Sequence, residues 1–280
     1  MKNNRQNSFK TNNGIQSEEC RKSSGDTSCV AFPPKFTHIV SKSSYMSKKC
    51  PLTNIPSSFP EAVNLSLKFS EMANEYLKSL YETVVVKDIV KRNNLRKFDT
   101  LKQVLNFLFD SVRSVVSPNN ITDVLHKNVT EKLSHNTVLK YLQYFTESYL
   151  IYPVRLYNIK GKRLLQSNYK YYVVDWRLKS ILQSNAYDAD LGHKLENVVY
   201  LELLSRGGEV FAGRTDNGEV DFVVQKYDGQ KEYYQVAYTV SDEKTLNREL
   251  SSLRKIRDSY PKYLLTMDFF TNNSCRAAIL

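Results

Sequence analysis

The chain has 280 residues, of which 41% are hydrophobic and 25% charged, a composition typical of a globular protein of about two domains. Lys and Arg outnumber Asp and Glu by 40 to 29, so the formal charge of +11 favours an acidic partner such as nucleic acid. No run of 18 apolar residues and no secretory signal occur, which predicts a cytoplasmic protein that does not enter a membrane.

The two ends of the chain and the distribution of charge set further expectations. Residues 1–58 are polar, basic and rich in Ser, and we expect them to be disordered. Residues 166–280 carry 15 basic and 16 acidic side chains, so a phosphate-binding surface is expected in the first 165 residues. Free thiols are expected at the cysteines, which form no CxxC pair: Cys20, Cys29, Cys50 and Cys275.

Helices are predicted over the first half of the remaining chain. Apolar residues recur three and four apart from Leu65 to Val84, which indicates one or two amphipathic helices in a lead-in over residues 59–97. A domain over residues 98–174 is expected to begin with three helices. They are predicted over residues 100–112, from an N-cap at Ser117 with Pro118 in the first helical position to His126, and from Ser134 onward.

Two β-rich runs over residues 149–157 and 163–174 follow these helices, joined by a basic turn. Three helices before a hairpin are the order of a winged helix, in which the third helix enters the major groove of duplex DNA and the hairpin tip contacts phosphates. A winged helix that only docks one domain against another fits the same pattern, and both interpretations stay open. The expected DNA contacts are Ser134, His135, Asn136, Thr137 and Lys140 on the helix and Lys160, Lys162 and Arg163 at the tip.

A second domain is predicted over residues 175–270, followed by a tail over residues 271–280. Its elements have the order helix, three strands, helix, strand, so the fold class predicted for the chain is α+β. The helices are expected over residues 192–206 and, with Ser241 as the cap, from Ser241 to Ser259; the strands are expected over residues 209–214, 218–226, 231–240 and 263–267.

This α-β-β-β-α-β order, with Glu196 on the first helix and Asp221 on the second strand, resembles the restriction-endonuclease-like core of the PD-(D/E)XK nuclease superfamily. The resemblance implies carboxylates that hold Mg²⁺ and an E-x-K pair on the third strand. Here that strand reads Gln235-Val236-Ala237, so Gln235 could offer an amide oxygen but no lysine follows. Because a missing electrophilic donor costs about two to three decades in rate, a scaffold without catalysis or metal is favoured, with a Mg-dependent nuclease as the alternative.

A longer resemblance covers about residues 60–268. The chain is similar to prokaryotic AAA-type ATPases that end in an uncharacterised nuclease-like domain, in which a lid, a winged-helix linker and a third strand that commonly reads Gln-Val-Ala follow the ATPase core. The phrases that carry it are YLKSLYETVVVKDIVKR (76–92), LSHNTVLKYLQYFTESYLIYPVRLYNIKGKRLL (133–165), KYYVVDWRL (170–178), LENVVYLELLSRGGEVFAG (195–213), and EVDFVVQK with YYQVAYTVSDE (219–243).

The chain departs from that family at its phosphate loop. No GxxxxGK[ST] motif occurs, and the one Gly-Lys pair, Gly161-Lys162, is followed by Arg and Leu. No ATP site or other cofactor is therefore expected, and a truncated or rearranged copy of the family is predicted. The expected function is a non-catalytic DNA-binding or domain-docking module. The alternatives are the nuclease and a protein-interaction module, whose partner would be an ATPase core or a second copy of the chain.

Overall fold

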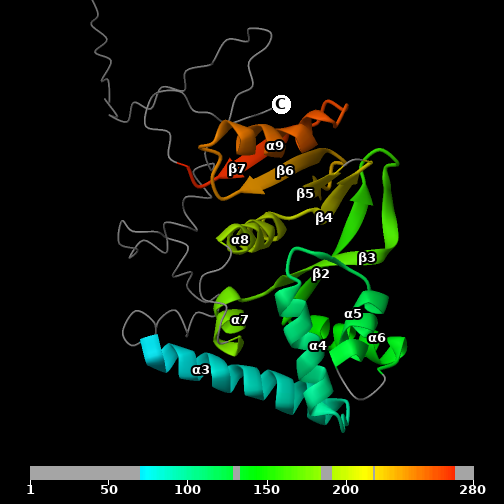
Figure 1. Ribbon diagram of the computed structural model, residues 1–280, viewed down its shortest axis with the longest axis vertical. Helices are drawn as coiled ribbons and strands as arrows, with labels where there is room; N and C mark the ends of the chain where they lie inside the picture. The colour runs from blue at the N-terminus through cyan, green and yellow to red at the C-terminus, as the bar shows by residue number, and fades with distance from the viewer. Residues whose placement is uncertain (1–69, 129–132, 184–190, 217, 269–280) are drawn as a thin grey trace, which may run out of the picture.

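The computed structural model describes residues 70–128, 133–183, 191–216 and 218–268 (Figure 1). The segment 1–58, the tail 271–280 and the four cysteines, on which the sequence made predictions, lie outside these residues. The helices are α3 (Ser70–Glu82), its π-helical continuation η1 (Thr83–Lys91), α4 (Phe98–Asp110), α5 (Pro118–Asn128), α6 (His135–Glu147), α7 (Trp176–Leu182), α8 (Leu191–Ser205) and α9 (Glu243–Arg254). The strands are β1 (Val115–Val116), β2 (Ile151–Asn158), β3 (Arg163–Val173), β4 (Glu209–Thr215), β5 (Gly218–Gln225), β6 (Lys231–Ala237) and β7 (Lys262–Thr266).

The described strands form one mixed sheet of seven strands in the order β1-β3-β2-β4-β5-β6-β7. Neighbouring strands are antiparallel except in the pairs β2–β4 and β6–β7, which are parallel. The β2–β4 pairing, in which Leu156 lies opposite Ala212, joins the N-terminal hairpin to the C-terminal strands. The sheet is therefore continuous across the boundary expected after residue 174, and the predicted α+β class is confirmed.

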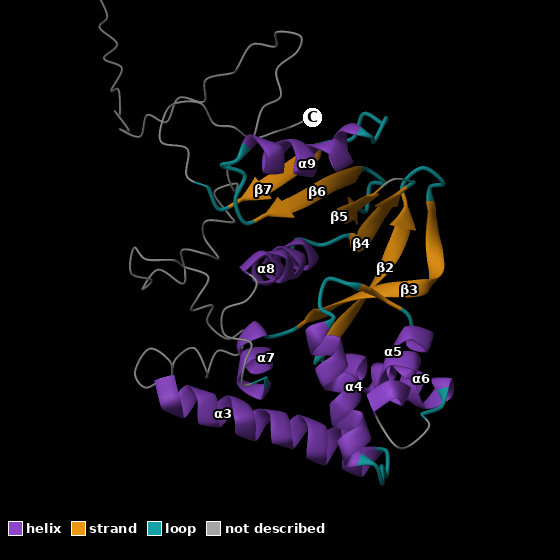
Figure 2. Ribbon diagram, in the orientation of Figure 1, coloured by secondary structure: helices purple, strands orange, loops and turns teal. Residues whose placement is uncertain are grey.

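Helices α8 and α9 cover opposite faces of the C-terminal strands, as Figure 2 shows. On one face Leu195 and Val199 of α8 share a buried cluster with Phe222 of β5. On the other face Leu250 of α9 packs in a separate cluster with Tyr233 of β6. Alternate residues of a strand point to opposite faces, so the inner residues of β5 and β6, buried on both sides, are mostly apolar, with Asp221 and Gln235 as the polar exceptions.

Helices α4, α5 and α6 gather at the other end of the molecule, beside the base of the β2–β3 hairpin (Figure 1). The apolar stripe predicted for α4 is buried, with Leu101, Leu105 and Leu108 fully inaccessible to solvent. Helix α3 packs against α7, and Arg177 donates to Asn74 Oδ1 at 3.0 Å. Within the described residues, no helix has both the length and the apolar surface needed to cross a membrane.

Side-chain caps explain where several of the helices begin. Ser134 accepts a hydrogen bond from the Thr137 N–H and begins α6, as predicted. The prediction that Ser241 caps the following helix is wrong, because the side chain of Asp242 accepts from the Thr245 N–H instead. That helix also ends at Arg254 rather than at Ser259, because the next residues turn to bury Ile256 in the core. Neither α7 nor the two-residue β1 was predicted, since both are too short to show a period.

Candidate functional site

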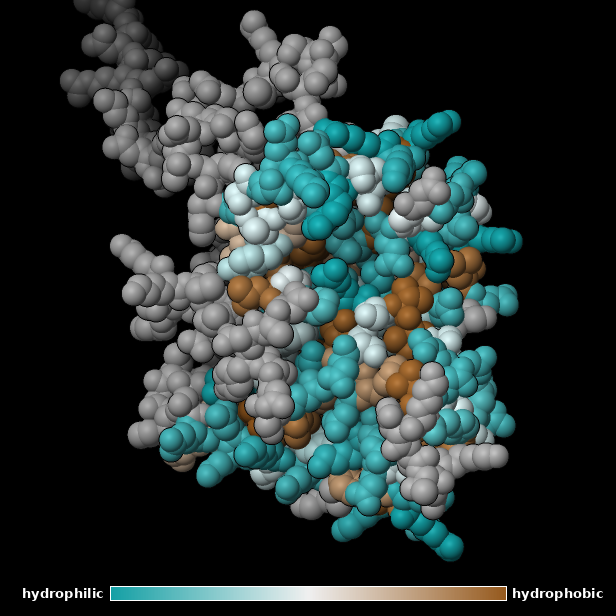
Figure 3. All heavy atoms as spheres, in the orientation of Figure 1, coloured by the Kyte–Doolittle hydropathy of each residue, from teal (hydrophilic) through white to brown (hydrophobic). Residues whose placement is uncertain are grey.

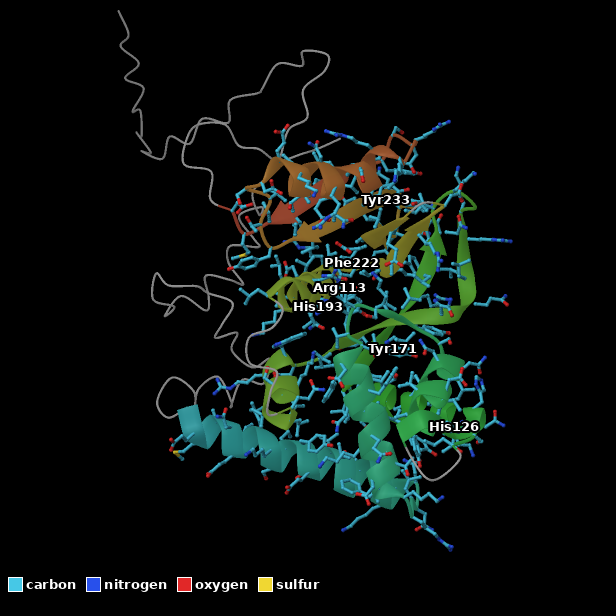
Figure 4. The ribbon with its side chains drawn as sticks, in the orientation of Figure 1. Arg113, His126, Tyr171, His193, Phe222 and Tyr233 are labelled. Atoms are coloured by element: carbon cyan, nitrogen blue, oxygen red, sulfur yellow. The ribbon has the colours of Figure 1, made fainter. Side chains whose placement is uncertain are left out.

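A cluster of buried charges lies where α8 meets the sheet. Its centre is Glu196, which is only 1% exposed. The hydroxyl of Tyr172 on β3 donates to Glu196 Oε1 at 2.7 Å, and Arg113 Nε lies 3.2 Å from Oε2. Figure 4 shows Arg113 beside α8. The cluster thus joins the loop before β1, the hairpin and the C-terminal part of the sheet.

Helix α8 is fixed to β3 at this point by the next residue, Asn197. Its side chain accepts from the Val173 N–H and donates to the Val173 carbonyl, both at 2.9 Å. The apolar residues of α8 are distributed around the whole helix, as expected of a buried helix, and Glu196 is therefore buried along with them. The two residues 196 and 197 therefore set both the position of α8 and the position of the carboxylate.

The third strand of the nuclease-like order, β6, supplies no lysine to these carboxylates, but another strand does. Lys170 of β3, only 2% exposed, brings its ammonium to 4.0 Å from Glu196 Oε1 and 3.2 Å from Glu219 Oε2. Lys170 lies more than 60 residues before the E-x-K position, on a hairpin assigned to another domain, so spacing along the chain could not reveal it. The single signal in the sequence is a charged residue within the otherwise apolar and aromatic run of β3, YKYYVV.

Asp221 reaches the same region through an irregularity in the sheet. The register of β4 and β5 shifts between Phe211 and Gly213, opposite Asp221, which is the signature of a β-bulge. A bulge redirects the side chains on its strand. The carboxylate of Asp221 is buried, and Oδ2 accepts a hydrogen bond from the Val236 N–H of β6 at 2.8 Å. One carboxylate oxygen of Asp221 is thus bonded to the backbone of the neighbouring strand.

The pKa values follow from burial and mutual attraction. Burial, with repulsion from Asp221, raises the pKa of Glu196 to about 8, against the opposing effects of Lys170 and Arg113. Burial also raises the pKa of Asp221, and Lys170 opposes this shift. Burial alone would lower the pKa of Lys170, but attraction by Glu196, Asp221 and Glu219 outweighs it and raises that pKa. The cluster therefore retains the lysine as a cation and favours a neutral Glu196.

The carboxylate expected to bind Mg²⁺ on α8 already has protein partners. Glu196 receives donors from Tyr172 and Arg113, and the ammonium of Lys170 lies 4.0 Å from its Oε1. The third expected ligand, Gln235, donates through Nε2 to Glu249 of α9 at 2.9 Å, and its buried amide oxygen has no hydrogen-bond partner among the described residues. In the described part of the chain no group of three or more His, Cys, Asp or Glu side chains is arranged to hold a metal ion.

The residues predicted to contact DNA fall into two separate places. On α6, His135, Asn136 and Lys140 are exposed, whereas the hydroxyls of Ser134 and Thr137 bond to each other at 2.8 Å within the helix cap. At the hairpin tip, Lys160, Lys162 and Arg163 are also exposed. Figure 1 shows the tip beside the β4–β5 turn, whereas α6 lies with α4 and α5 at the other end of the hairpin. The two sets therefore do not form one continuous surface.

The tip has a fixed shape. The Gly161 N–H donates to Asn158 Oδ1 at 2.7 Å, and Lys162 adopts a left-handed conformation with φ of 50°. Lys160 Nζ lies 2.6 Å from Asp216 Oδ2 in the β4–β5 turn, which ties the tip to the C-terminal strands. The cations are thus held on a turn of defined conformation, next to the β4–β5 turn.

Comparison with known proteins shows a sequence similarity over part of this chain. Residues 55–186 match a domain of unknown function, DUF8612. An uncharacterized protein of Haemophilus influenzae is 33% identical over 204 residues, which cover 71% of this chain and 50% of the relative. Uncharacterized protein MJ1544 of Methanocaldococcus jannaschii is 30% identical over 187 residues, which cover 65% of this chain and 40% of the relative.

The segment of this chain that matches DUF8612 ends before α8. The segments that match the two relatives are longer than that segment. The chain spans half or less of the length of these two relatives. None of the names of these proteins states an activity. Residues 55–186 are therefore similar to DUF8612, and the chain has distant relatives in a bacterium and in an archaeon.

Proposed function

We propose that the chain is a non-catalytic, nucleic-acid-binding portion of a AAA-type ATP-binding protein. In this proposal residues 98–174 are a winged helix, and residues 175–270 are a nuclease-like scaffold. The helices α4, α5 and α6, the hairpin β2–β3 and the antiparallel pairing of β1 with β3 have the order and pairing that a winged helix requires. The relatives, about twice as long as the matched segment, leave room for an ATPase core.

The observation that carries the proposal is the group of exposed cations at the hairpin tip, Lys160, Lys162 and Arg163. Cations on an ordered turn can contact successive phosphates without rearrangement, and each contact releases counterions from the nucleic acid. The side chains of His135, Asn136 and Lys140 on α6 add a second exposed set of donors. Phosphate contacts alone give binding without sequence preference, so we expect weak specificity from the tip and any base reading from α6.

The buried charges support the non-catalytic part of the proposal. The ammonium of Lys170, which is buried on β3, lies between the carboxylates of Glu196 and Glu219 and is therefore engaged within the protein. Removing the ammonium would leave the buried Asp221 without the cation that offsets its burial, at a cost of about 3–5 kcal/mol. The cluster is thus explained as a structural ion-pair network between the hairpin and the C-terminal half.

Binding is tested by fluorescence anisotropy of a labelled DNA duplex over a NaCl series. We expect the affinity of the parent chain to fall steeply with salt and the K160E/K162E/R163E variant to lose binding. The H135A/N136A/K140A variant should lose preference among sequences more than it loses affinity. If the tip variant bound as well as the parent, the hairpin would serve docking, and self-association or binding to an ATPase core would become the better explanation.

The alternative of a Mg-dependent nuclease is favoured by one observation, the juxtaposition of Lys170 with Glu196 and Asp221. Incubation of supercoiled plasmid with Mg²⁺ or Mn²⁺ decides between the two. We expect no cleavage, and no rise in melting temperature on adding Mg²⁺. Cleavage by the parent chain that D221N abolishes would overturn the non-catalytic proposal and make Lys170 the first residue to test next.

A further inference from the structure

A basic cavity of about 760 Å³ opens where three segments distant in the sequence meet. One is the hairpin tip, the second is the turn between β4 and β5, and the third is the chain that leaves α9. Figure 3 shows hydrophilic residues over the α9 end of the molecule. The lining residues are Ile159, Lys160, Lys162, Thr215, Asp216, Arg254, Lys255, Ile256, Arg257 and Asp258.

The charge in this cavity is strongly unbalanced. Five of its lining side chains are cations and two are acids. Both acids are already engaged: Asp216 pairs with Lys160 at 2.6 Å, and Asp258 Oδ2 accepts from the Tyr233 hydroxyl at 2.5 Å. For the other four cations, Lys162, Arg254, Lys255 and Arg257, the described residues provide no ion pair, and all four are exposed. These four side chains form what we call the cationic rim.

The backbone beneath the cationic rim is held in place. Leu253 and Ile256 are buried in the core, so Arg254, Lys255 and Arg257 stand outward on either side of an anchored residue. The ammonium of Lys262 donates to the carbonyl of Asp258 at 2.6 Å, which fixes the chain just after Arg257. Cations on such a support lose little further conformational entropy when a ligand binds.

A structural role at the end of α9 explains only part of this pattern. Cations in the last turn of a helix are favoured by its dipole, and this accounts for Arg254 and Lys255. It does not account for Arg257, which lies beyond the helix, or for Lys162, which comes from the hairpin. Four like charges facing one cavity repel one another, and an anionic ligand removes that repulsion.

We propose that this cavity binds phosphate groups of a nucleic-acid backbone, so that the hairpin tip and the chain after α9 form one phosphate-binding surface. The inference rests on the proposed function and extends it to residues after position 190, where the net charge along the sequence predicted no such surface. Arginine guanidinium groups suit phosphate because their paired N–H donors match two of its oxygens. The volume accommodates more than one phosphate, as a continuous backbone requires.

The test compares three chains in the duplex anisotropy assay: the parent, R254E/K255E/R257E, and the control K78E/K102E/K244E, which changes the charge equally at exposed sites outside the cavity. We expect the cavity variant to bind at least tenfold more weakly than the control. The slope of log affinity against log salt should become shallower by about 3, since each lost phosphate contact reduces its magnitude by about 0.9. Equal binding by the cavity variant and the control would overturn the inference.

Two further arms separate the inference from the proposed function. If K160E/K162E/R163E loses binding while R254E/K255E/R257E keeps it, the chain binds DNA but not through the cavity. If the parent binds no DNA, the proposed function fails, and a thermal shift with inorganic phosphate and tripolyphosphate decides the cavity alone. A rise in the melting temperature of the parent that the cavity variant lacks would then assign the cavity to free phosphates. No rise in the parent would overturn the inference that the cavity binds phosphate. K255A/R257A repeats each arm if the charge reversals disturb folding.

Discussion

At the scale of single residues, Lys170 has the strongest influence on its surroundings. A buried cation among three acids is stabilising only while its partners remain, and removal of one member leaves uncompensated charge in the interior. A cluster of this kind stabilises the hairpin in its present position against α8. The next two predictions concern its two central members.

Replacing Lys170 with Met should destabilise the protein by about 3–5 kcal/mol, because Asp221 then loses the cation that offsets its burial. Urea unfolding followed by circular dichroism measures this change. The exposed residue Lys78 provides the control, since K78M should change stability by no more than about 0.5 kcal/mol. The K170M/E196Q double variant should lose less than the two single losses added together. Full additivity would show that the two residues do not interact.

Glu196 should make stability depend on pH in a defined direction. Its pKa is about 8 in the folded chain against 4.5 for the isolated group, so between these values the folded state binds more protons. Stability should therefore fall as pH rises from 5 to 8, by up to about 1.4 kcal/mol per pH unit. We expect E196Q to flatten this dependence in urea titrations at a series of pH values. A parent chain of constant stability across this range would contradict the assigned pKa.

At the scale of elements, α6 depends on its cap. Ser134 accepts from the Thr137 N–H at 3.1 Å, and S134A should cost about 1 kcal/mol, within the usual range for a lost cap. S134D should keep most of the stability, since an Asp side chain makes the same bond. Thermal unfolding of the three chains measures the difference. Equal loss in S134A and S134D would assign the effect to contacts outside the cap.

The sequence predicted elements better than it predicted the neighbours of each side chain. Helices α4, α6 and α8 were found because period and caps are local properties, as at Ser134 and at Gly207-Gly208, whose φ values of 84° and 91° end α8. The site was found in part: Glu196 and Asp221 do meet, but Lys170 and Arg113 join them from other elements. Such meetings depend on the parallel pairing of β2 with β4, which leaves no periodic signal in the chain.

At the scale of the whole molecule, the hairpin and the C-terminal half share one sheet and one main core. That core contains buried residues from Leu77 on α3 to Leu265 on β7. A shared core and a continuous sheet favour a single unfolding transition over two independent ones.

We therefore expect the described part of the chain to unfold as one unit. Trp176, the one tryptophan of the chain, is 8% exposed and lies on α7 in the shared core. Its fluorescence and the far-ultraviolet circular dichroism should give coincident urea transitions. Two separated midpoints would indicate that the N-terminal and C-terminal halves unfold independently. The boundary after residue 174 would then separate two units of unfolding.

The β2–β4 pairing also decides where the chain can be cut. A fragment that stops at residue 186, where the match to DUF8612 ends, lacks α8, β4 and β5 and so removes Glu196, Glu219 and Asp221 together. It would leave the edge of β2 open to pair with other molecules, and Lys170 would remain without its acids. Expression of residues 55–186 alone should therefore yield aggregates, while residues 55–268 should yield a monodisperse product in size-exclusion chromatography. A segment recognised as one domain by its sequence would thus be an incomplete unit of folding.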